Sequence, residues 1–262
     1  MTDRTPVTVA GASGRMGQVL CALLHDHPAL RLRACLQRPG HPLVDGGGPD
    51  GVLVTDDPGA ALEAAPVVVD FTTPPASLAI ARAAAARGAV HIIGTTGFTP
   101  EDLAALDRAG QGAVTIRAGN MSLGVNLLVQ LTRRVAAALG SEFDIEILEA
   151  HHRAKVDAPS GTALMLGEAA AEGRGVSLEK AAQRGRDGLT GPRPDGAIGF
   201  AALRGGDIVG EHDVLFAGPG ERIVLRHIAT DRTIFARGAL KAAEWGLGRA
   251  PGTYDMLDVL DI

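Results

Sequence analysis

The chain has 262 residues, of which 46% are hydrophobic, enough for one large domain or two of moderate size with apolar cores. Its 25 basic and 30 acidic residues give a net charge of −5, which excludes a general attraction to nucleic acid or to acidic membranes. The 35 glycines and 15 prolines follow no repeat, which excludes collagen-like and low-complexity chains.

Cysteine content and the apolar runs bear on the compartment of the protein. Two cysteines, Cys21 and Cys35, are too few for a disulfide framework and lack the spacing of a zinc or redox motif, so we expect buried free thiols. Residues 1–4 are polar and do not begin a secretion signal. No apolar run approaches the roughly 20 residues that cross a bilayer. We therefore expect a cytoplasmic protein.

The first half of the chain alternates short apolar strands with helical segments, the pattern of a parallel sheet with helices on both faces. Strands are predicted at 7–10, 32–36, 67–71, 90–93 and 114–117, and helices at 16–24, 76–87 and 101–109. The glycine-rich segment 39–50 is predicted to lack regular structure and to be mobile. The pattern indicates a Rossmann-like, doubly wound α/β domain.

After residue 120 the pattern changes. A helix at 123–139 precedes a strand in which Phe143, Ile145 and Ile147 alternate with acidic residues, so that one face of this strand is polar. Strands are predicted at 198–204, 211–217 and 222–227, without helices between them, and a last helix at 234–247. This predicts a second, α+β domain with a mixed, largely antiparallel sheet, one face of which is exposed or covered by a partner.

We place the first domain at residues 1–122 and the second at 123–230. Residues 231–262 are expected to return to the first domain, because the amphipathic last helix needs a surface on which to bury its apolar side. Hinge closure is expected near residues 121–124 and 231.

The first predicted strand leads through Gly11, Gly14 and Gly17 into a helix. Glycines permit a tight turn and a close approach of the backbone to a pyrophosphate, which the free amides of a helix N-terminus attract. The spacing is GxxGxxG and not GxGxxG, so a plain tight turn is the alternative interpretation. The turn favours a dinucleotide-binding domain.

The second strand ends at Gln37 and Arg38, where an NAD-specific enzyme would place a carboxylate against the ribose. Gln37 lacks the charge that repels a 2′-phosphate, and Arg38 could pair with one or could be a solvated loop residue. NADPH is therefore expected to be accepted, and NADH stays open. Phe71, Thr72 and residues 94–96 follow later strands at the ligand-binding edge of the sheet, with turn chemistry as the alternative.

Residues 149–163 concentrate potential cations, namely His151, His152, Arg153 and Lys155. In a chain of negative charge this predicts an anionic ligand. Ser160, Gly161 and Thr162 then open a helix whose first amides and cap hydroxyls can bind a carboxylate.

Each of these residues also has a plainer interpretation. The histidine pair could be structural or metal-ligating, but no third ligand is evident and no metal is expected. Lys155 could be a surface residue, and Asp157 could form an Asx turn or pair with the lysine. Together the residues predict a site for a small acid beside a general acid.

The chain resembles the 4-hydroxy-tetrahydrodipicolinate reductases, also called dihydrodipicolinate reductases, of diaminopimelate and lysine biosynthesis. The matching motifs cover essentially the whole chain: GASGRMG at 11–17, DFT at 70–72, GTTGF at 94–98, NMSLGVN at 120–126, EAHHRAKVDAPSGT at 149–162, GDIVGEH at 206–212 and DMLDVL at 255–260. The motif at 149–162 is the specific one, and the glycine turn alone is not.

The resemblance implies that a small dicarboxylate is reduced by hydride from NADPH or NADH. It implies that His151 and Lys155 are the acid and base pair, with the proton donor left open, and that His152, Ser160, Gly161 and Thr162 bind the substrate. The implied cofactor contacts are Gly11, Ala12, Ser13, Gly14, Arg15, Met16, Gln37, Arg38, Phe71, Thr72, Gly94, Thr95, Thr96, Ala118, Gly119, Asn120 and Met121. Family members that prefer NADH often carry an acidic residue at the position of Gln37, and a phenylalanine is frequent in the family at the position of Met121.

The resemblance also implies a homotetramer formed through the sheet of the second domain. Two rival interpretations are another two-domain nicotinamide-dependent dehydrogenase of amino-acid metabolism, which would lack the 151–162 run, and a non-catalytic dinucleotide-sensing regulator. Whether the enzyme itself dehydrates the substrate is open.

Overall fold

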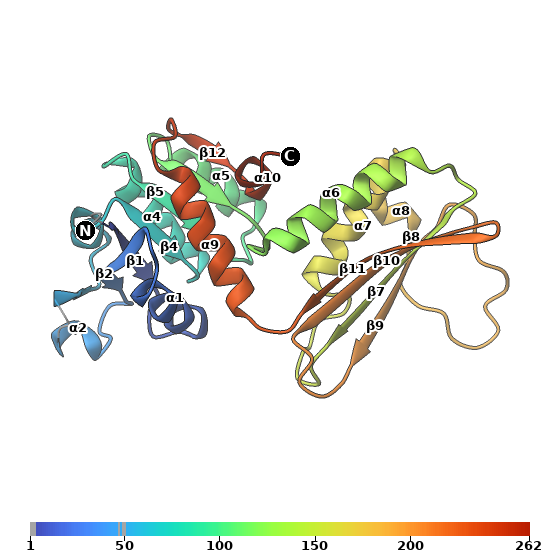
Figure 1. The fold of residues 1–262 in the computed structure, drawn as a ribbon, viewed down its shortest axis with the longest axis horizontal. Helices are drawn as coiled ribbons and strands as arrows, with labels where there is room; N and C mark the ends of the chain where they lie inside the picture. The colour runs from blue at the N-terminus through green and yellow to red at the C-terminus, as the bar shows by residue number, and fades with distance from the viewer. Residues whose placement is uncertain (1–3, 47, 49–50) are drawn as a thin grey trace. The chain divides into compact units, whose positions relative to one another are not determined.

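The computed structural model describes residues 4–46, 48 and 51–262. They divide into two compact units, which are treated separately below (Figure 1). The first unit comprises Met1–Leu123 and Thr233–Ile262, and the second comprises Gly124–Arg232.

The first unit is built on a seven-stranded sheet in the order β12-β6-β5-β4-β1-β2-β3, in which every pairing among the described residues is parallel. Its strands are β1 (Thr5–Ala10), β2 (Leu30–Leu36), β3 (Leu53–Thr55), β4 (Val67–Asp70), β5 (Val90–Ile93), β6 (Val114–Arg117) and β12 (Gly252–Tyr254). The chain winds outward from β1 in both directions, so a crevice for a ligand is expected at the carboxyl ends of β1 and β4.

Helices cover both faces of this sheet. They are α1 (Arg15–His25), α2 (Leu43–Gly46), α3 (Pro58–Ala64), α4 (Pro74–Ala85), α5 (Pro100–Ala109), α9 (Thr233–Gly246) and α10 (Met256–Leu260). Helices α1, α9 and α10 share one core with alternate strand residues, and α3 and α4 share another core with the opposite residues. Both faces of β4 are therefore buried, which explains the run Val67, Val68 and Val69 at 0% exposure.

The predicted elements are present, with ends moved by one or two residues. Helix α4 begins two residues early because Pro74 is compatible with the first helical turn, where its missing amide hydrogen is not needed. The segment 39–50 was expected to lack regular structure, but it contains the short helix α2. Residues 47, 49 and 50 of that segment lie outside the described residues. Strand β3 and helix α3 were not predicted, because their three and seven residues are too few to show a clear period.

The second unit has a mixed five-stranded sheet in the order β11-β10-β7-β9-β8. The central strand β7 (Asp144–His151) pairs antiparallel with β10 (Gly210–Gly218) and parallel with β9 (Ile198–Arg204). The outer strands are β11 (Glu221–Ala229) and β8 (Ala182–Gln183), and the helices are α6 (Leu123–Ala138), α7 (Gly161–Gly173) and α8 (Leu178–Ala181). The core forms between the sheet and helices α6 and α7.

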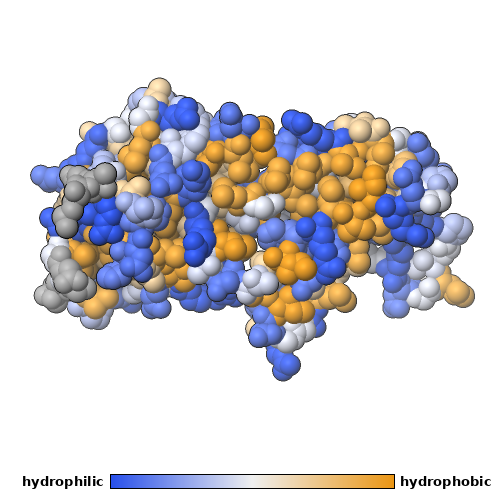
Figure 2. Space-filling model, viewed as in Figure 1, coloured by the Kyte–Doolittle hydropathy of each residue, from blue (hydrophilic) through white to orange (hydrophobic). Residues whose placement is uncertain are grey.

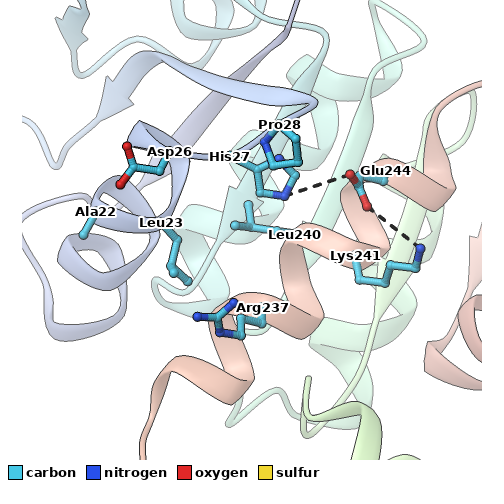
Figure 3. A pocket seen from close by; sticks show the side chains of 9 residues that line it. All are labelled: Ala22, Leu23, Asp26, His27, Pro28, Arg237, Leu240, Lys241 and Glu244. Atoms are coloured by element: carbon cyan, nitrogen blue, oxygen red, sulfur yellow. Dashed lines mark ion pairs between the residues drawn. The ribbon is translucent and has the colours of Figure 1, made fainter.

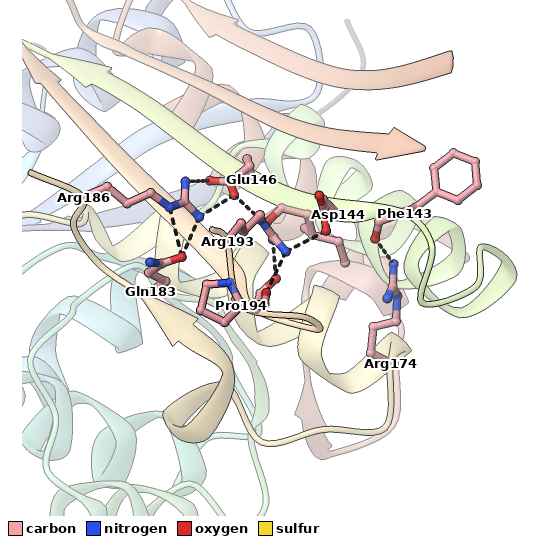
Figure 4. Close-up of polar contacts among 10 residues, drawn as sticks. Phe143, Asp144, Glu146, Arg174, Gln183, Arg186, Arg193 and Pro194 are labelled. Carbon is pink, nitrogen blue, oxygen red and sulfur yellow. Dashed lines mark hydrogen bonds and ion pairs between the residues drawn. The ribbon is translucent and has the colours of Figure 1, made fainter. Parts of the chain in front are cut away.

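The other face of this sheet carries both charged and apolar side chains. Glu146 of β7 forms ion pairs with Arg186 and Arg193, whose nearest atoms lie 2.7 and 2.8 Å from its Oε1, and Arg193 also contacts Asp144 at 2.7 Å (Figure 4). These contacts fasten the connection between β8 and β9 to the strand. Elsewhere on the strands of this sheet the apolar side chains Leu148, Leu203, Val224 and Ile228 are exposed.

Apolar surface also gathers over α6, where Leu127 and Leu131 are exposed (Figure 2). Among the described residues, no helix has the length and hydropathy needed to cross a membrane. Cys21 and Cys35 are free, as expected, but both are only partly buried, because they line a cavity beside β2 together with Leu32 and Val54.

Candidate active site

The turn after β1 shows why glycines stand there. Gly11 has a φ of 68°, in the left-handed region that side chains disfavour. A Cβ on Gly17 would lie 2.2 Å from the Gly11 carbonyl oxygen, so only glycine lets α1 pack against the turn. The helix begins at Arg15 after Gly14, which offers no side-chain cap, and the first amides of α1 stay available to an anion.

A cavity of about 450 Å³ lies beside this turn. The predicted cofactor residues that line it are Gly11, Ser13, Gly14, Gln37, Arg38, Phe71 and Thr72. Gln37 is 6% exposed; its Oε1 accepts a hydrogen bond from the Ser13 hydroxyl at 3.1 Å, whereas its Nε2 has no partner among the described residues. Because an unsatisfied buried donor is costly, this amide fits a site where a ligand supplies the acceptor.

Two loops at the same edge of the sheet are joined by the carboxylate of Asp70, which is fully buried. Its Oδ1 accepts hydrogen bonds from the Thr72 amide at 2.9 Å and the Thr95 hydroxyl at 3.1 Å. Its Oδ2 accepts one from the Ser77 hydroxyl at 2.5 Å and lies 3.2 Å from His91 Nε2. Asp70 therefore fixes the loops after β4 and β5 relative to each other. Asp70 was not among the predicted site residues, although it begins the motif at 70–72.

Burial by itself would raise the pKa of Asp70. The hydrogen bond and charge of His91, with the hydroxyls of Ser77 and Thr72, outweigh this effect and hold the pKa below its ordinary value. The carboxylate is thus ionised inside the unit, where it can accept all of these hydrogen bonds.

The other predicted cofactor residues lie in different surroundings. Gly94 lies directly under Phe71, because a Cβ there would be 2.2 Å from the Phe71 ring. The side chains of Ala12 and Met121 are buried in the apolar core of the first unit, at 8% and 1% exposure. Arg15, Met16, Thr96, Ala118, Gly119 and Asn120 do not line the 450 Å³ cavity.

Another cavity of the first unit, of about 440 Å³, lies between the end of α1 and helix α9 and contains no predicted site residue (Figure 3). Two of its basic side chains lie beside Glu244. Glu244 lies 4.0 Å from His27 Nε2 and 3.9 Å from Lys241 Nζ.

In the second unit, Glu149 is the first residue of the predicted cationic segment, and its side chain is 1% exposed. Its Oε2 lies 2.5 Å from His151 Nδ1, and its Oε1 accepts a hydrogen bond from the Ser160 amide at 3.1 Å. Arg204 donates to both carboxylate oxygens, at 2.7 and 2.6 Å, from its position opposite His151 in the β7–β9 pairing. Burial would raise the pKa of Glu149, but Arg204 and His151 hold it below its ordinary value.

A third histidine completes this cluster. The rings of His151 and His212 meet edge to face, with centroids 5.1 Å apart. His212 Nε2 lies 3.0 Å from the Ser160 hydroxyl, which also accepts a hydrogen bond from the Ala163 amide and caps α7. Burial, followed by the charge of His151, lowers the pKa of His212 to about 4. Burial likewise lowers the pKa of His151, although Glu149 opposes this effect.

Lys155 and Asp157 form an ion pair of 2.9 Å, so the salt-bridge interpretation of Asp157 is the one that the structure supports. His152 and Thr162 are half-buried and Gly161 is exposed at the start of α7. The described residues contain no cluster of three or more side chains suited to a metal ion. The structure thus joins His151 and Ser160 in one cluster and adds three residues that were given no site role, Glu149, Arg204 and His212. Glu149 begins the motif at 149–162 and His212 ends the motif at 206–212, whereas Arg204 lies in none of the motifs.

The doubly wound first unit, its glycine turn and the mixed second sheet define a two-unit α/β protein with a dinucleotide-binding type of fold. A solved structure with the same fold is an engineered D-amino acid dehydrogenase bound to NADP+, at a TM-score of 0.56, with 14% identity, 98% of this chain and 94% of that chain. At this identity the likeness shows the fold alone.

Two family models, "Dihydrodipicolinate reductase, N-terminus" and "C-terminus", match residues 5–121 and 124–260. The chain belongs to the 4-hydroxy-tetrahydrodipicolinate reductase family, oxidoreductases of diaminopimelate and lysine biosynthesis, as the sequence motifs predicted.

Members of this family agree with the chain over its length. The 4-hydroxy-tetrahydrodipicolinate reductase of Ruegeria pomeroyi is 62% identical, with full coverage of both chains, and that of Beijerinckia indica is 55% identical over 98% of this chain and 97% of its own. The dipicolinate-bound dihydrodipicolinate reductase from Paenisporosarcina sp. TG-14 has a TM-score of 0.78 and 25% identity, with coverage of 98% of this chain and 99% of that one.

Proposed function

We propose that this protein reduces 4-hydroxy-tetrahydrodipicolinate, by way of dihydrodipicolinate, to tetrahydrodipicolinate with NADPH or NADH. The observation that carries the proposal is the cluster around His151, which sits next to the amino end of α7 and beside two further cations, Lys155 and Arg204. A relative with the same fold binds dipicolinate, a planar ring with two carboxylates, which supports a substrate of this shape and charge.

The first unit has the features that a nicotinamide dinucleotide needs. The bound nucleotide would supply the hydride. The amides of residues 11–16 would hold its pyrophosphate, and the unpartnered Gln37 Nε2, with Arg38, would bind the 2′-hydroxyl or 2′-phosphate. Residue 37 is an uncharged glutamine and not a carboxylate that would repel the 2′-phosphate, so NADPH is accepted. Thr72 and Thr95, held by Asp70, and the backbone of 118–121 would contact the nicotinamide end.

The second unit would bind the substrate. One carboxylate is held by His152 and by the first turn of α7, where Gly161 leaves the backbone open and Thr162 adds a hydroxyl. Ser160 keeps that turn in place through its cap. His151 and Lys155 lie on the same segment and are the acid and base pair that manages the proton which the reduced ring requires.

The domains of the proposal are 1–122 with 231–262 for the nucleotide, and 123–230 for the substrate and for assembly. Exposed apolar side chains on the sheet of the second unit, Leu148, Leu203, Val224 and Ile228, support a homotetramer formed through that sheet. We place the activity in the cytoplasm, in keeping with the biosynthetic pathway.

Steady-state kinetics with both nucleotides test the proposal. We expect oxidation of NADPH, followed at 340 nm, to depend on added 4-hydroxy-tetrahydrodipicolinate, and to saturate with it. Lys155→Ala should lose most turnover while nucleotide affinity stays unchanged. Tight nucleotide binding without turnover in the unaltered protein would instead favour a dinucleotide-sensing regulator.

A further inference from the structure

The carboxylate of Glu149 is buried and has hydrogen-bond donors on both of its oxygens. Four donors surround it: two nitrogens of Arg204, His151 Nδ1 and the Ser160 amide. A carboxylate this deeply buried is stable only where such partners satisfy it. Its position, and the positions of the groups that it touches, are therefore closely fixed.

We propose that Glu149, held by Arg204, is a positioning residue that keeps a proton on His151 Nδ1 and thereby presents Nε2 to the substrate. The proposal deepens the proposed function, because it names the nitrogen through which His151 exchanges its proton.

The tautomer follows from the chemistry of the pair. An ionised carboxylate only accepts hydrogen bonds, so the atom 2.5 Å from Glu149 Oε2 must be an N–H donor. Since Nδ1 keeps its hydrogen in both the neutral and the charged ring, any proton that His151 gives or takes passes through Nε2. Gly210 keeps the space next to Nε2 free of a side chain, because a Cβ on this residue would lie only 3.1 Å from that nitrogen.

The same carboxylate also positions the amino end of α7, where a substrate carboxylate is proposed to bind. Its Oε1 holds the Ser160 amide, the residue that caps α7, and Arg204 reaches on to the Asp157 carbonyl at 2.7 Å. One anion thus sets the distance between the proton-carrying ring and the helix terminus at which a substrate carboxylate would bind. A shift of Glu149 would disturb both at once.

The groups around His151 determine the direction in which its pKa is shifted. The charged groups that act on His151 are Glu149 on β7, Arg204 on β9 and Lys155 in the loop, where Lys155 also pairs with Asp157. The neighbouring ring of His212 on β10 has His227 on β11 as a further titratable neighbour. Burial lowers the pKa of His151 most strongly, Glu149 raises it, and Lys155 and Arg204 lower it further. Removal of the negative charge of Glu149 must therefore lower the pKa of His151.

The decisive variant is Glu149→Gln, which keeps the shape of the side chain and removes its charge. We expect kcat to fall by about 10- to 100-fold, as for other partners that orient a functional histidine. The ionisation of the histidine in the pH profile of kcat/KM should move to lower pH, and the Kd for NADPH, whose binding residues lie in the other unit, should not change.

Glu146→Gln is the matched control. Glu146 lies three residues earlier on the same strand and also binds two arginines (Figure 4). Among the described residues it forms no ion pair with a histidine. This variant should keep the kcat and the pH profile of the unaltered protein. An equal loss in both variants would mean that any damage to β7 lowers activity, and it would overturn the proposal.

A second measurement does not depend on turnover. Nitrogen-15 NMR of the unaltered protein, with the His151 signals assigned through His151→Gln, should show the proton on Nδ1. A dominant Nε2–H tautomer would overturn the proposal even if Glu149→Gln failed to fold. Absence of turnover in the unaltered protein would remove the proposed function, whereas normal kinetics of Glu149→Gln would remove only this inference.

Discussion

Each unit contains a buried carboxylate next to a histidine, yet the two pairs differ in what surrounds them. Asp70 and His91 are both fully buried, and the other partners of Asp70 are hydroxyls and an amide. The Glu149–His151 pair has an arginine behind it, and the side chain of His151 is 11% exposed. The comparison teaches that a sealed pair fastens loops, whereas a pair with one accessible ring nitrogen can also exchange protons with a ligand.

Substitution of the two histidines should separate these roles most strongly. His151→Asn is expected to lower kcat by about 10²- to 10⁴-fold, the range for loss of a general acid or base. His91→Asn should instead raise the KM for NADPH through the loops that Asp70 holds, without a change in the pH profile of kcat. Steady-state kinetics across pH would measure both. A shifted kcat profile in His91→Asn would mean that the sealed pair also exchanges protons.

Removal of the carboxylate from the sealed pair tests its structural role. Asp70→Ala leaves Ser77, Thr72, Thr95 and His91 without their shared acceptor, and we expect it to lower the free energy of unfolding by about 3 kcal/mol. Urea denaturation would give this value. A loss well below 1 kcal/mol would show that water replaces the carboxylate and that the loops do not depend on it.

Acidification should weaken the cluster of the second unit first. His212 has a pKa lowered from 6.5 to about 4 in the folded protein, so its neutral form stabilises the fold fully above pH 6.5 and this contribution is lost as the pH falls toward 4. The shift corresponds to about 3 kcal/mol, an order-of-magnitude value. His151 and His227, whose pKa values burial also lowers, add to the same slope.

The buried carboxylates change the free energy of unfolding only at lower pH. The pKa values of Asp70 and Glu149 are held below 3.8 and 4.5, so their contributions are present above these values and are lost only as the pH falls through the lower folded values. Unfolding at a series of pH values should therefore show a slope between pH 6.5 and 4 that His212→Asn reduces. An unchanged slope in this variant would contradict the assignment to His212.

The smallest expected effect concerns nucleotide choice. Gln37→Glu should weaken NADPH binding about 10-fold relative to NADH, because a carboxylate beside the 2′-phosphate adds repulsion of about 1.4 kcal/mol. Fluorescence titration with both nucleotides would measure the ratio. The kinetic behaviour of His151 should be unaffected, which would confirm that nucleotide selection and proton exchange belong to separate units.

The sequence predicted the strands, the helices and the main site segments because these depend on local patterns. Continuous valines indicated β4, alternation indicated β7, and the glycines before α1 indicated the nucleotide turn. The short strands and helices escaped prediction, since a few residues carry no clear period. They are β3, β8, β12, α2, α3, α8 and α10.

Long-range partners could not be predicted in the same way. Arg204 lies 55 residues from Glu149, and His212 lies 52 residues from Ser160, so their contacts depend on how β9 and β10 pair with β7. The role of Asp70 was hidden for a similar reason, because Thr95 and His91 reach it from the neighbouring strand and loop. The sequence motifs contain Asp70, Thr95, Glu149, Ser160 and His212 but not His91 or Arg204, and they do not show which of these residues meet.

His151 pairs with Arg204 between β7 and β9, so the ion pair between Arg204 and Glu149 depends on the register of these two strands. Neighbouring residues of a strand point to opposite faces, so a slip of one residue would turn the guanidinium away and leave Glu149 as an uncompensated anion in the protein interior. Misaligned forms of this sheet are therefore penalised by charge as well as by packing. Selection for catalysis and selection for correct folding would then act on the same arginine.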